Sequence, residues 1–166
     1  MCDIERVIMY LIPKEFFITS GKALSGVSDL NAFDMALMDA GIEEQNLVAV
    51  SSIIPPGAEK VEKFRLPMGA VTHCVLAQMR GKGGDRISAG IGYAYRKDGN
   101  GGYVAEAHIF GGETAVREQL RRKVKEMERI RGIELTEPVI VSQTLDVPEG
   151  QFGCCLASLV FTRYQE

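Results

Sequence analysis

The sequence predicts an α+β sandwich, in which antiparallel strands form the sheets and two helices cover their outer faces. Two segments, 25–42 and 114–131, carry apolar residues at helical spacing, and the segments around them carry strand-forming residues bounded by turn residues. The two helices are far apart along the chain and do not alternate with strands one by one. A layered fold is therefore expected, and a doubly wound parallel sheet is not.

Length and composition are typical of one globular domain. The chain has 166 residues, of which 46% are hydrophobic and 25% charged, enough to bury a core without disulfide bridges. A net charge of −3 argues against a nucleic-acid-binding protein. The apolar run 7–12 holds six residues, far below the roughly 20 that span a bilayer, and no secretory cleavage site follows it. We expect a cytoplasmic protein that binds neither nucleic acid nor membrane.

The four cysteines show no spacing typical of a metal site. Cys154 and Cys155 are adjacent, so on a strand their side chains would point to opposite faces. Free cysteine is commonly buried in protein cores. We therefore expect Cys2, Cys74, Cys154 and Cys155 to be reduced and mostly buried, and we expect no metal ion.

The first half of the chain is predicted to hold three strands and one helix. Apolar residues recur on one face of this helix, at Leu30, Phe33, Leu37 and Ala40. Gly41 suits its C-terminal cap. Residues that can cap its start are Ser28, Asp29 and Asn31. The strands are expected at 6–11, 46–54 and 68–79.

The second half is predicted to hold a hairpin, a long helix and two further strands. The loop KDGNGG joins strands 87–95 and 103–110 and favours an antiparallel pair. The helix at 114–131 has an apolar stripe and ends at a glycine, and its basic cluster 121–123 is expected to face solvent rather than nucleic acid. The two last strands are expected within 138–147 and 153–161.

The stretch NLVAVSSIIPPGAEK, residues 46–60, raises the main functional question, because Ser51 and Ser52 interrupt one of the most apolar segments. Taken alone, small hydroxyl residues ahead of Pro55 and Pro56 are typical of a strand end. A different chemistry would give the pair a function. If the Ser52 hydroxyl attacks the Ser51 carbonyl, the amide becomes an ester, and elimination followed by hydrolysis leaves a pyruvoyl group.

A pyruvoyl group is a ketone that forms a Schiff base with an amine, so it supports amino-acid chemistry without pyridoxal phosphate. Its formation needs a buried, rigid strand end, and Pro55 and Pro56 would fix the chain just downstream. It also needs a donor that polarises the carbonyl to be attacked. Asn46 is the nearest side-chain amide, although Asn46 is equally suited to be a turn residue that opens the strand.

Other common enzyme classes have weaker support in the sequence. His108 lies two residues after Glu106 on a predicted strand, so their side chains would share one face. No nucleophile motif of the G-x-S-x-G type accompanies them, so hydrolysis by a serine triad is not favoured. The glycine-rich nucleotide-binding motifs are missing after a strand as well.

Four runs, LNAFDMALMDAGI, NLVAVSSIIPPGAE, KFRLPMGA and VAEA, occur in this order. Together they make the sequence closely similar to the small pyruvoyl-dependent arginine decarboxylases over essentially the whole chain. The resemblance implies a four-layer αββα sandwich of mainly antiparallel sheets, with residues 1–166 in one pyruvoyl-dependent decarboxylase domain. It implies self-cleavage between Ser51 and Ser52 into a β chain, 1–51, and an α chain, 52–166. It further implies a trimer or a dimer of trimers, with active sites between neighbouring protomers.

The resemblance also implies a role for four residues. Ser52 becomes the pyruvoyl group, and Asn46 matches the asparagine that assists cleavage and orients the carbonyl. Glu106 matches the proton donor, and Asp34 matches the carboxylate that binds the guanidinium group of the substrate. A proton donor must hold its proton near neutral pH, so we expect Glu106 to be desolvated or near another negative charge. Without the resemblance, Glu106 and Asp34 would also fit an exposed strand and an exposed helix position.

The predicted function is conversion of L-arginine to agmatine and CO2 through a Schiff base with the Ser52-derived pyruvoyl group, without pyridoxal phosphate or metal. Two alternatives stay open. One is a homologue that never cleaves and acts as a structural or regulatory subunit. The other is a decarboxylase of another basic amino acid, such as lysine or ornithine, for which the carboxylate of Asp34 would serve in the same way.

Overall fold

A computed structural model describes residues 10–165 of the chain. Its elements are, in chain order, β1 Pro13–Ser25, α1 Asp29–Ala40, β2 Asn46–Ala49, β3 Ile53–Ile54, β4 Glu59–Lys60, β5 Val71–Lys82, β6 Arg86–Tyr95, β7 Gly102–Phe110, α2 Glu113–Arg131, β8 Val139–Asp146 and β9 Phe152–Tyr164. The strands form a five-stranded sheet in the order β2-β5-β9-β1-β4 and a four-stranded sheet in the order β3-β7-β6-β8.

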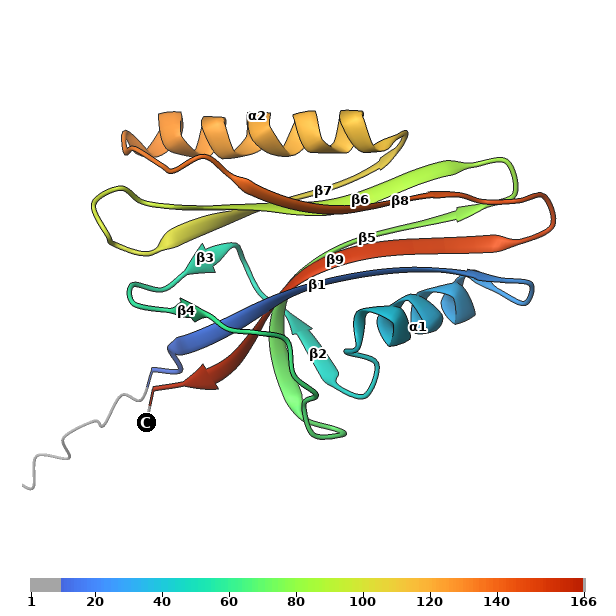
Figure 1. The fold of residues 1–166 in the computed structure, drawn as a ribbon, viewed down its shortest axis with the longest axis horizontal. Coiled ribbons are helices and arrows are strands. Elements are labelled where there is room, and N and C mark those ends of the chain that lie inside the picture. The colour runs from blue at the N-terminus through green and yellow to red at the C-terminus, as the bar shows by residue number, and fades with distance from the viewer. Residues whose placement is uncertain (1–9, 166) are drawn as a thin grey trace, which may run out of the picture.

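The two sheets lie face to face between the two helices, so the described chain has four layers (Figure 1). Helix α1 covers the outer face of the five-stranded sheet, and α2 covers the outer face of the four-stranded sheet. Most strand pairs are antiparallel. Within the described residues, the parallel pairs are those of two short strands, β2 with β5 and β4 with β1. The predicted four-layer αββα sandwich is therefore confirmed.

Strand β9 shows why the layers hold together. Cys155 and Leu159 belong to the apolar core between the sheets, whereas Cys154 and Leu156 belong to the core under α1. Because side chains alternate along a strand, both faces of β9 are buried, and its sequence is a continuous apolar run. The prediction that Cys74, Cys154 and Cys155 are buried free thiols is confirmed. Cys2 lies outside the described residues.

Helix α1 has the predicted ends, and it buries Leu37 and Ala40 of the predicted apolar face but not Leu30. The Ser28 hydroxyl accepts a hydrogen bond from the Asn31 amide at 3.1 Å, and Gly41 ends the helix in the left-handed conformation. Leu30 was expected in the core but is 63% exposed, and alanines pack against the sheet instead. The reason is close approach, because a side chain at Gly21 of β1 would collide with the α1 backbone. Only small residues fit that contact.

Helix α2 and the hairpin agree with the prediction. Val116, Leu120 and Val124 form the buried stripe of α2, and Gly132 ends the helix in the left-handed conformation. Strands β6 and β7 pair antiparallel, with Ile91 opposite Glu106. Strands β8 and β9 were also expected, although the structure places them in different sheets.

Two strand predictions differ from the structure. The strand expected at 6–11 falls almost entirely outside the described residues, and residues 10–11 are not in a strand. The long strand β1, Pro13–Ser25, was missed, because its glycine and charged residues hide the apolar pattern. The strand expected at 46–54 is wrong as one element, since the structure divides it between the two sheets.

Candidate active site

The serine pair lies where the chain crosses from one sheet to the other. Before it, the Val50 amide donates a hydrogen bond to the Cys74 carbonyl at 2.9 Å, which ends the pairing of β2 with β5. After it, the Ser52 carbonyl accepts a hydrogen bond from the Val104 amide at 3.0 Å, where β3 begins to pair with β7. The interruption of the apolar run at Ser51 is therefore a crossover between layers.

The peptide bond between Ser51 and Ser52 has a polarised carbonyl. The Ile53 amide donates a hydrogen bond to the Ser51 carbonyl oxygen at 3.0 Å, which closes a γ-turn around Ser52. A donor at a carbonyl oxygen stabilises the negative charge that develops there during nucleophilic attack. Ser51 is exposed and Ser52 is half-buried, so the crossover is less buried than the sequence suggested.

Glu106 lies beside this crossover. It is on the same face of β7 as Val104, whose side chain belongs to the core between the sheets. Burial raises the pKa of the Glu106 carboxyl, and the Lys123 charge, the Ser52 hydroxyl and the His108 ring lower it by less. Because burial dominates, the carboxyl keeps its proton to higher pH than an ordinary glutamate. This desolvation agrees with the expectation for a proton donor.

Asn46 occupies the opposite end of β2 from the serine pair. Its side-chain amide donates a hydrogen bond to the Gly69 carbonyl at 2.9 Å, and its backbone amide donates to the Ala70 carbonyl at 2.9 Å. These bonds tie the start of β2 to the turn before β5. Within the described residues, Asn46 has no hydrogen bond to Ser51 or Ser52.

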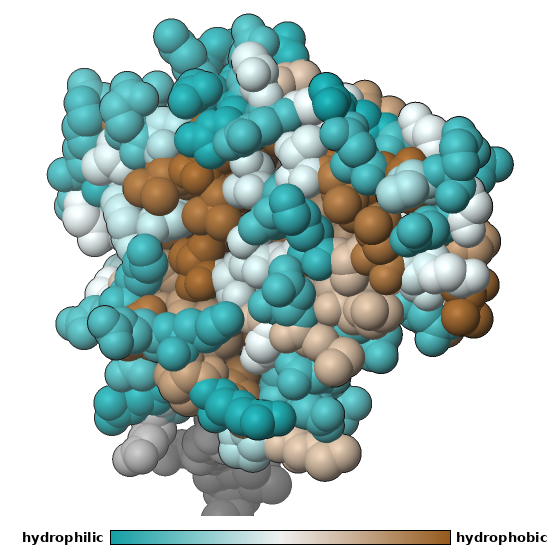
Figure 2. Space-filling view, turned by 45° about the vertical axis from the view of Figure 1, so that its right-hand side comes forward, coloured by the Kyte–Doolittle hydropathy of each residue, from teal (hydrophilic) through white to brown (hydrophobic). Residues whose placement is uncertain are grey.

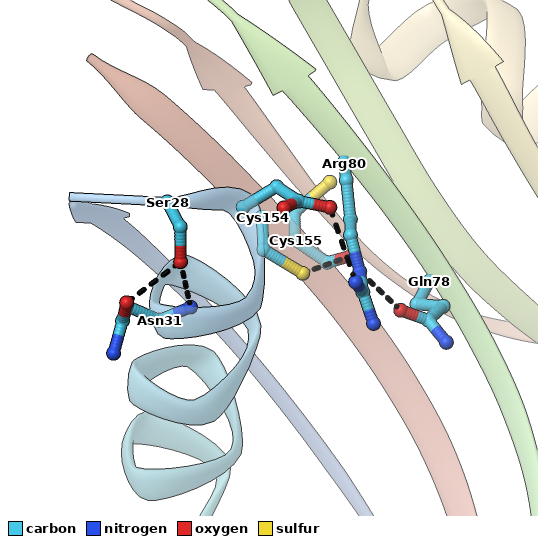
Figure 3. Close-up of polar contacts among 7 residues, drawn as sticks. Ser28, Asn31, Gln78, Arg80, Cys154 and Cys155 are labelled. Carbon is cyan, nitrogen blue, oxygen red and sulfur yellow. Dashed lines mark hydrogen bonds and ion pairs between the residues drawn. The ribbon is translucent and has the colours of Figure 1, made fainter. Parts of the chain in front are cut away.

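Asp34 lies on α1, which is fixed to the five-stranded sheet at its first turn. Figure 3 shows Ser28 capping the helix through Asn31, while Arg80 extends from β5 and binds Gln78. Arg80 also pairs with Asp29 at 3.2 Å and lies 4.5 Å from the centre of the Phe33 ring. These contacts hold α1 in place.

Asp34 itself is exposed, on the outer layer of the molecule. Leu30 and Met38 lie one turn on either side of it and are 63% and 58% exposed. Other apolar side chains also form brown patches among polar ones on the face drawn in Figure 2. The single chain therefore brings Ser51, Ser52 and Glu106 together, and leaves Asp34 apart from them.

A pocket of about 550 Å³ opens beside the crossover. Its lining is mostly apolar and includes Val50, Ser51 and Ile53. His73 and Tyr164 also line it, and their side chains are joined by a hydrogen bond of 2.6 Å. A small molecule that enters this pocket can approach the serine pair from the side of Ser51.

Lys123 of α2 reaches the same region from the other side of the four-stranded sheet. Its Nζ donates a hydrogen bond to the backbone carbonyl of Glu106 at 2.6 Å. The helical pattern predicts a solvent-facing position for this residue, because periodicity in one helix does not show which strand lies under it. No sequence signal could have identified this contact.

The described part of the chain shows no group of three or more histidine, cysteine, aspartate or glutamate side chains that could hold a metal ion. Among its helices, none is both long enough and apolar enough to cross a membrane.

Comparison with known proteins gives a consistent result. The family model described as pyruvoyl-dependent arginine decarboxylase (PvlArgDC) matches residues 15–166. The pyruvoyl-dependent arginine decarboxylase of Methanopyrus kandleri is 34% identical over 150 residues, which cover 90% of this chain and 97% of that protein. The protein of the same name from Methanothermobacter thermautotrophicus is 38% identical over 145 residues, covering 87% and 93%.

A third relative, pyruvoyl-dependent arginine decarboxylase 2 of Archaeoglobus fulgidus, is 35% identical over 159 residues, which cover 92% of this chain and 99% of that protein. These similarities extend over nearly the whole chain, and the family resemblance inferred from the sequence motifs is confirmed.

Proposed function

Because the chain belongs to the pyruvoyl-dependent arginine decarboxylase family, we propose that it is a cytoplasmic enzyme that converts L-arginine to agmatine and CO2. Its cofactor is the covalent pyruvoyl group of this family, which we propose is made from Ser52. The observation that carries the proposal is the position of the Glu106 carboxyl beside Ser52, next to a carbonyl that already accepts a hydrogen bond.

The group would form by self-cleavage of the chain. The Ser52 hydroxyl oxygen attacks the Ser51 carbonyl carbon, the peptide C–N bond breaks, and the proton of the hydroxyl passes to the nitrogen, which leaves an ester. Loss of the Ser52 α-proton then expels the Ser51 carboxylate, and water replaces the nitrogen of the resulting enamine, which releases ammonia. The products are a β chain, 1–51, and an α chain, 52–166, from the single domain 1–166.

The hydrogen bond from Ile53 to the Ser51 carbonyl supports the first step, because it stabilises charge on the attacked carbonyl. Asn46 is proposed to assist the same step. The hydrogen bond from Asn46 to the Gly69 carbonyl fixes the start of β2. Within one chain, Asn46 would therefore assist by holding β2, and with it the serine pair, in position.

The surroundings of Ser52 fit a pyruvoyl group. The Val104 amide donates a hydrogen bond to the Ser52 carbonyl oxygen at 3.0 Å. After cleavage this carbonyl would be the amide carbonyl that adjoins the ketone of the pyruvoyl group. When formed, the group supplies an electron-withdrawing ketone that can bind the substrate amine and accept the electrons left by CO2. Burial raises the pKa of the Glu106 carboxyl beside that position, so its proposed role is to protonate the α-carbon.

Asp34 is proposed to bind the guanidinium group through paired hydrogen bonds. In one chain it lies on the outer layer, away from Ser52, between the exposed apolar side chains of Leu30 and Met38. We therefore propose a trimer or a dimer of trimers, in which Asp34 of one protomer completes the active site of its neighbour.

Two measurements on the purified protein test the proposal together. Intact-mass analysis should find two chains that separate at Ser51–Ser52, with a blocked N-terminus on the larger chain. An assay with L-arginine should yield agmatine and CO2 in equal amounts. A single full-length chain after prolonged incubation would favour a non-catalytic homologue. Faster turnover of lysine or ornithine than of arginine would assign the enzyme to another basic amino acid.

A further inference from the structure

Sequence alone places the basic cluster 121–123 of α2 on a solvent-facing surface, yet Lys123 contacts the strand that carries the proposed proton donor. Its Nζ lies 2.6 Å from the backbone carbonyl oxygen of Glu106. We propose that Lys123 is a positioning residue of the active site, whose ammonium group fixes this part of β7 and stabilises the ionised form of the Glu106 carboxyl. The inference rests on the proposed function, in which Glu106 donates a proton to the substrate.

Helix α2 packs close to the sheet over two glycines of β6. A Cβ atom at Gly90 of β6 would lie 3.1 Å from Leu120 Cδ1, and one at Gly92 would lie 3.8 Å from Val124 Cγ2. At Gly90 the added Cβ would be too tight against Leu120, whereas at Gly92 it would make ordinary contacts, so α2 packs directly on β6 at these positions. Lys123 precedes the buried Val124, so its long side chain can cross to the neighbouring strand β7.

The charged and titratable groups that influence Glu106 electrostatically, or are influenced by it, come from several elements, and Lys123 and Cys74 do so across a sheet. Lys123 comes from α2, His108 from β7 and Cys74 from β5, and the Ser52 hydroxyl comes from the crossover. Burial raises the pKa of the Cys74 thiol to about 11, so this side chain is neutral near pH 7. Among the groups that lower the pKa of Glu106 against the effect of burial, Lys123 has the largest effect.

This balance has a direct consequence for catalysis. Burial without Lys123 would keep the Glu106 carboxyl protonated to still higher pH and make it a weaker acid. A weaker acid transfers its proton to the substrate more slowly, although it stays protonated over a wider pH range. Lys123 is therefore proposed to keep the acid strong while burial keeps it protonated.

The same helix offers a matched control. Lys125 is exposed, and it lines a different pocket together with Lys97 and Glu128. Lys125→Met removes one positive charge from α2, as Lys123→Met does, but it leaves the contact with Glu106 in place. A general effect of net charge would appear in both variants.

The test compares the pH dependence of kcat for arginine in the wild type, Lys123→Met, Lys123→Arg and Lys125→Met. Activity requires protonated Glu106, so its decline at alkaline pH should move to higher pH in Lys123→Met. The maximal kcat should fall in the same variant. Lys125→Met should follow the wild type, and Lys123→Arg, which keeps the charge, should restore most of the wild-type profile.

A second readout does not depend on turnover. The carboxyl carbon of Glu106 can be followed by NMR in the cleaved proteins labelled with [13C]glutamate and without substrate, and its signal is identified by its loss in Glu106→Gln. Its titration should move to higher pH in Lys123→Met and stay unchanged in Lys125→Met. Circular dichroism checks that each variant is folded. If Lys123→Met does not fold, Lys123→Gln replaces it as the variant without the positive charge.

The outcomes separate this inference from the proposed function. Identical titrations of Glu106 in the wild type and in Lys123→Met would overturn the role of Lys123, whatever the substrate is. Absence of arginine turnover in the wild type, with the shifted titration intact, would overturn the proposed substrate and leave the contact between Lys123 and Glu106 established.

Discussion

The Val104 amide donates a hydrogen bond to the Ser52 carbonyl at 3.0 Å, and this contact joins the serine pair to the strand that carries Glu106. Val104 and Glu106 are two residues apart on β7, so their side chains share the face toward the other sheet. This backbone hydrogen bond, together with the pairing of β3 with β7, therefore holds the bond to be cleaved next to the strand that carries the acid. Five predictions concern this site, and one concerns the packing of α1.

Replacing Ser52 by alanine should block both cleavage and activity, because the new side chain has no hydroxyl to form the ester. Ser51→Ala is the matched control, since it keeps the attacked carbonyl and the Ser52 hydroxyl, and it should cleave. Denaturing electrophoresis and intact mass give both results. Two chains from Ser52→Ala would rule out the proposed self-cleavage.

Glu106→Gln should still cleave but should decarboxylate arginine slowly, because the amide cannot supply the proton. Loss of acid–base assistance typically lowers kcat by roughly 10²- to 10⁴-fold. Single-turnover assays on fully cleaved protein separate this effect from slow processing. Near-normal turnover would mean that another group protonates the α-carbon.

Glu106 should also make stability depend on pH. Burial raises the pKa of its carboxyl in the folded chain, so the folded state binds this proton more tightly than the unfolded chain does. The free energy of unfolding should therefore fall as pH rises from about 4.3, the ordinary glutamate pKa, through the higher folded value. In the Ser52→Ala background, urea unfolding should show this fall, and adding Glu106→Gln should reduce it. An equal pH dependence in both proteins would contradict the raised pKa.

Asp34→Asn should cleave normally but lose affinity for the substrate guanidinium. The amide removes the charge and one acceptor oxygen, so kcat/KM for arginine should fall about 10- to 150-fold, the usual range for a hydrogen bond to a charged group. Citrulline is a neutral analogue of similar length and should lose much less. Equal losses for both compounds would show that Asp34 supports the pocket and does not bind the charge.

Mixing Asp34→Asn with Ser52→Ala tests whether the site is shared between protomers. If the two chains co-assemble after joint refolding, some sites combine a pyruvoyl group from the first with Asp34 from the second. Activity should then rise above that of either variant alone. No recovery in a verified mixed oligomer would place both residues of each site in the same chain.

Gly21→Ala should destabilise the protein, because the added methyl group would lie 2.7 Å from the Ala40 nitrogen and would also collide with the Ala36 carbonyl. Overpacking of this kind costs about 1–3 kcal/mol, and more where backbone must move. Gly26→Ala is the control, since nothing lies within 4 Å of its added Cβ. Thermal unfolding of both variants in the Ser52→Ala background gives the comparison, and equal melting temperatures would contradict the close contact of β1 and α1.

The sequence by itself determined the two helices and the hairpin, and it is also the basis of the chemistry proposed for the serine pair. These features depend on neighbours along the chain: an apolar stripe in α2, glycines at 41 and 132 that end the helices, and a hydroxyl next to a carbonyl at Ser51–Ser52. Local backbone preferences and periodicity are sufficient to predict such features.

Only the tertiary structure decided which sheet each strand joins and what surrounds Ser52. The crossover at Ser51–Ser52 exists because Val50 pairs with β5 and Ser52 with β7, and neither partner is close in sequence. The approach of Lys123 to Glu106 depends on how α2 packs over β6, which belongs to neither element of that pair. These contacts arise from the packing of distant segments, whose relative placement is set by the whole core and is not encoded in any one segment.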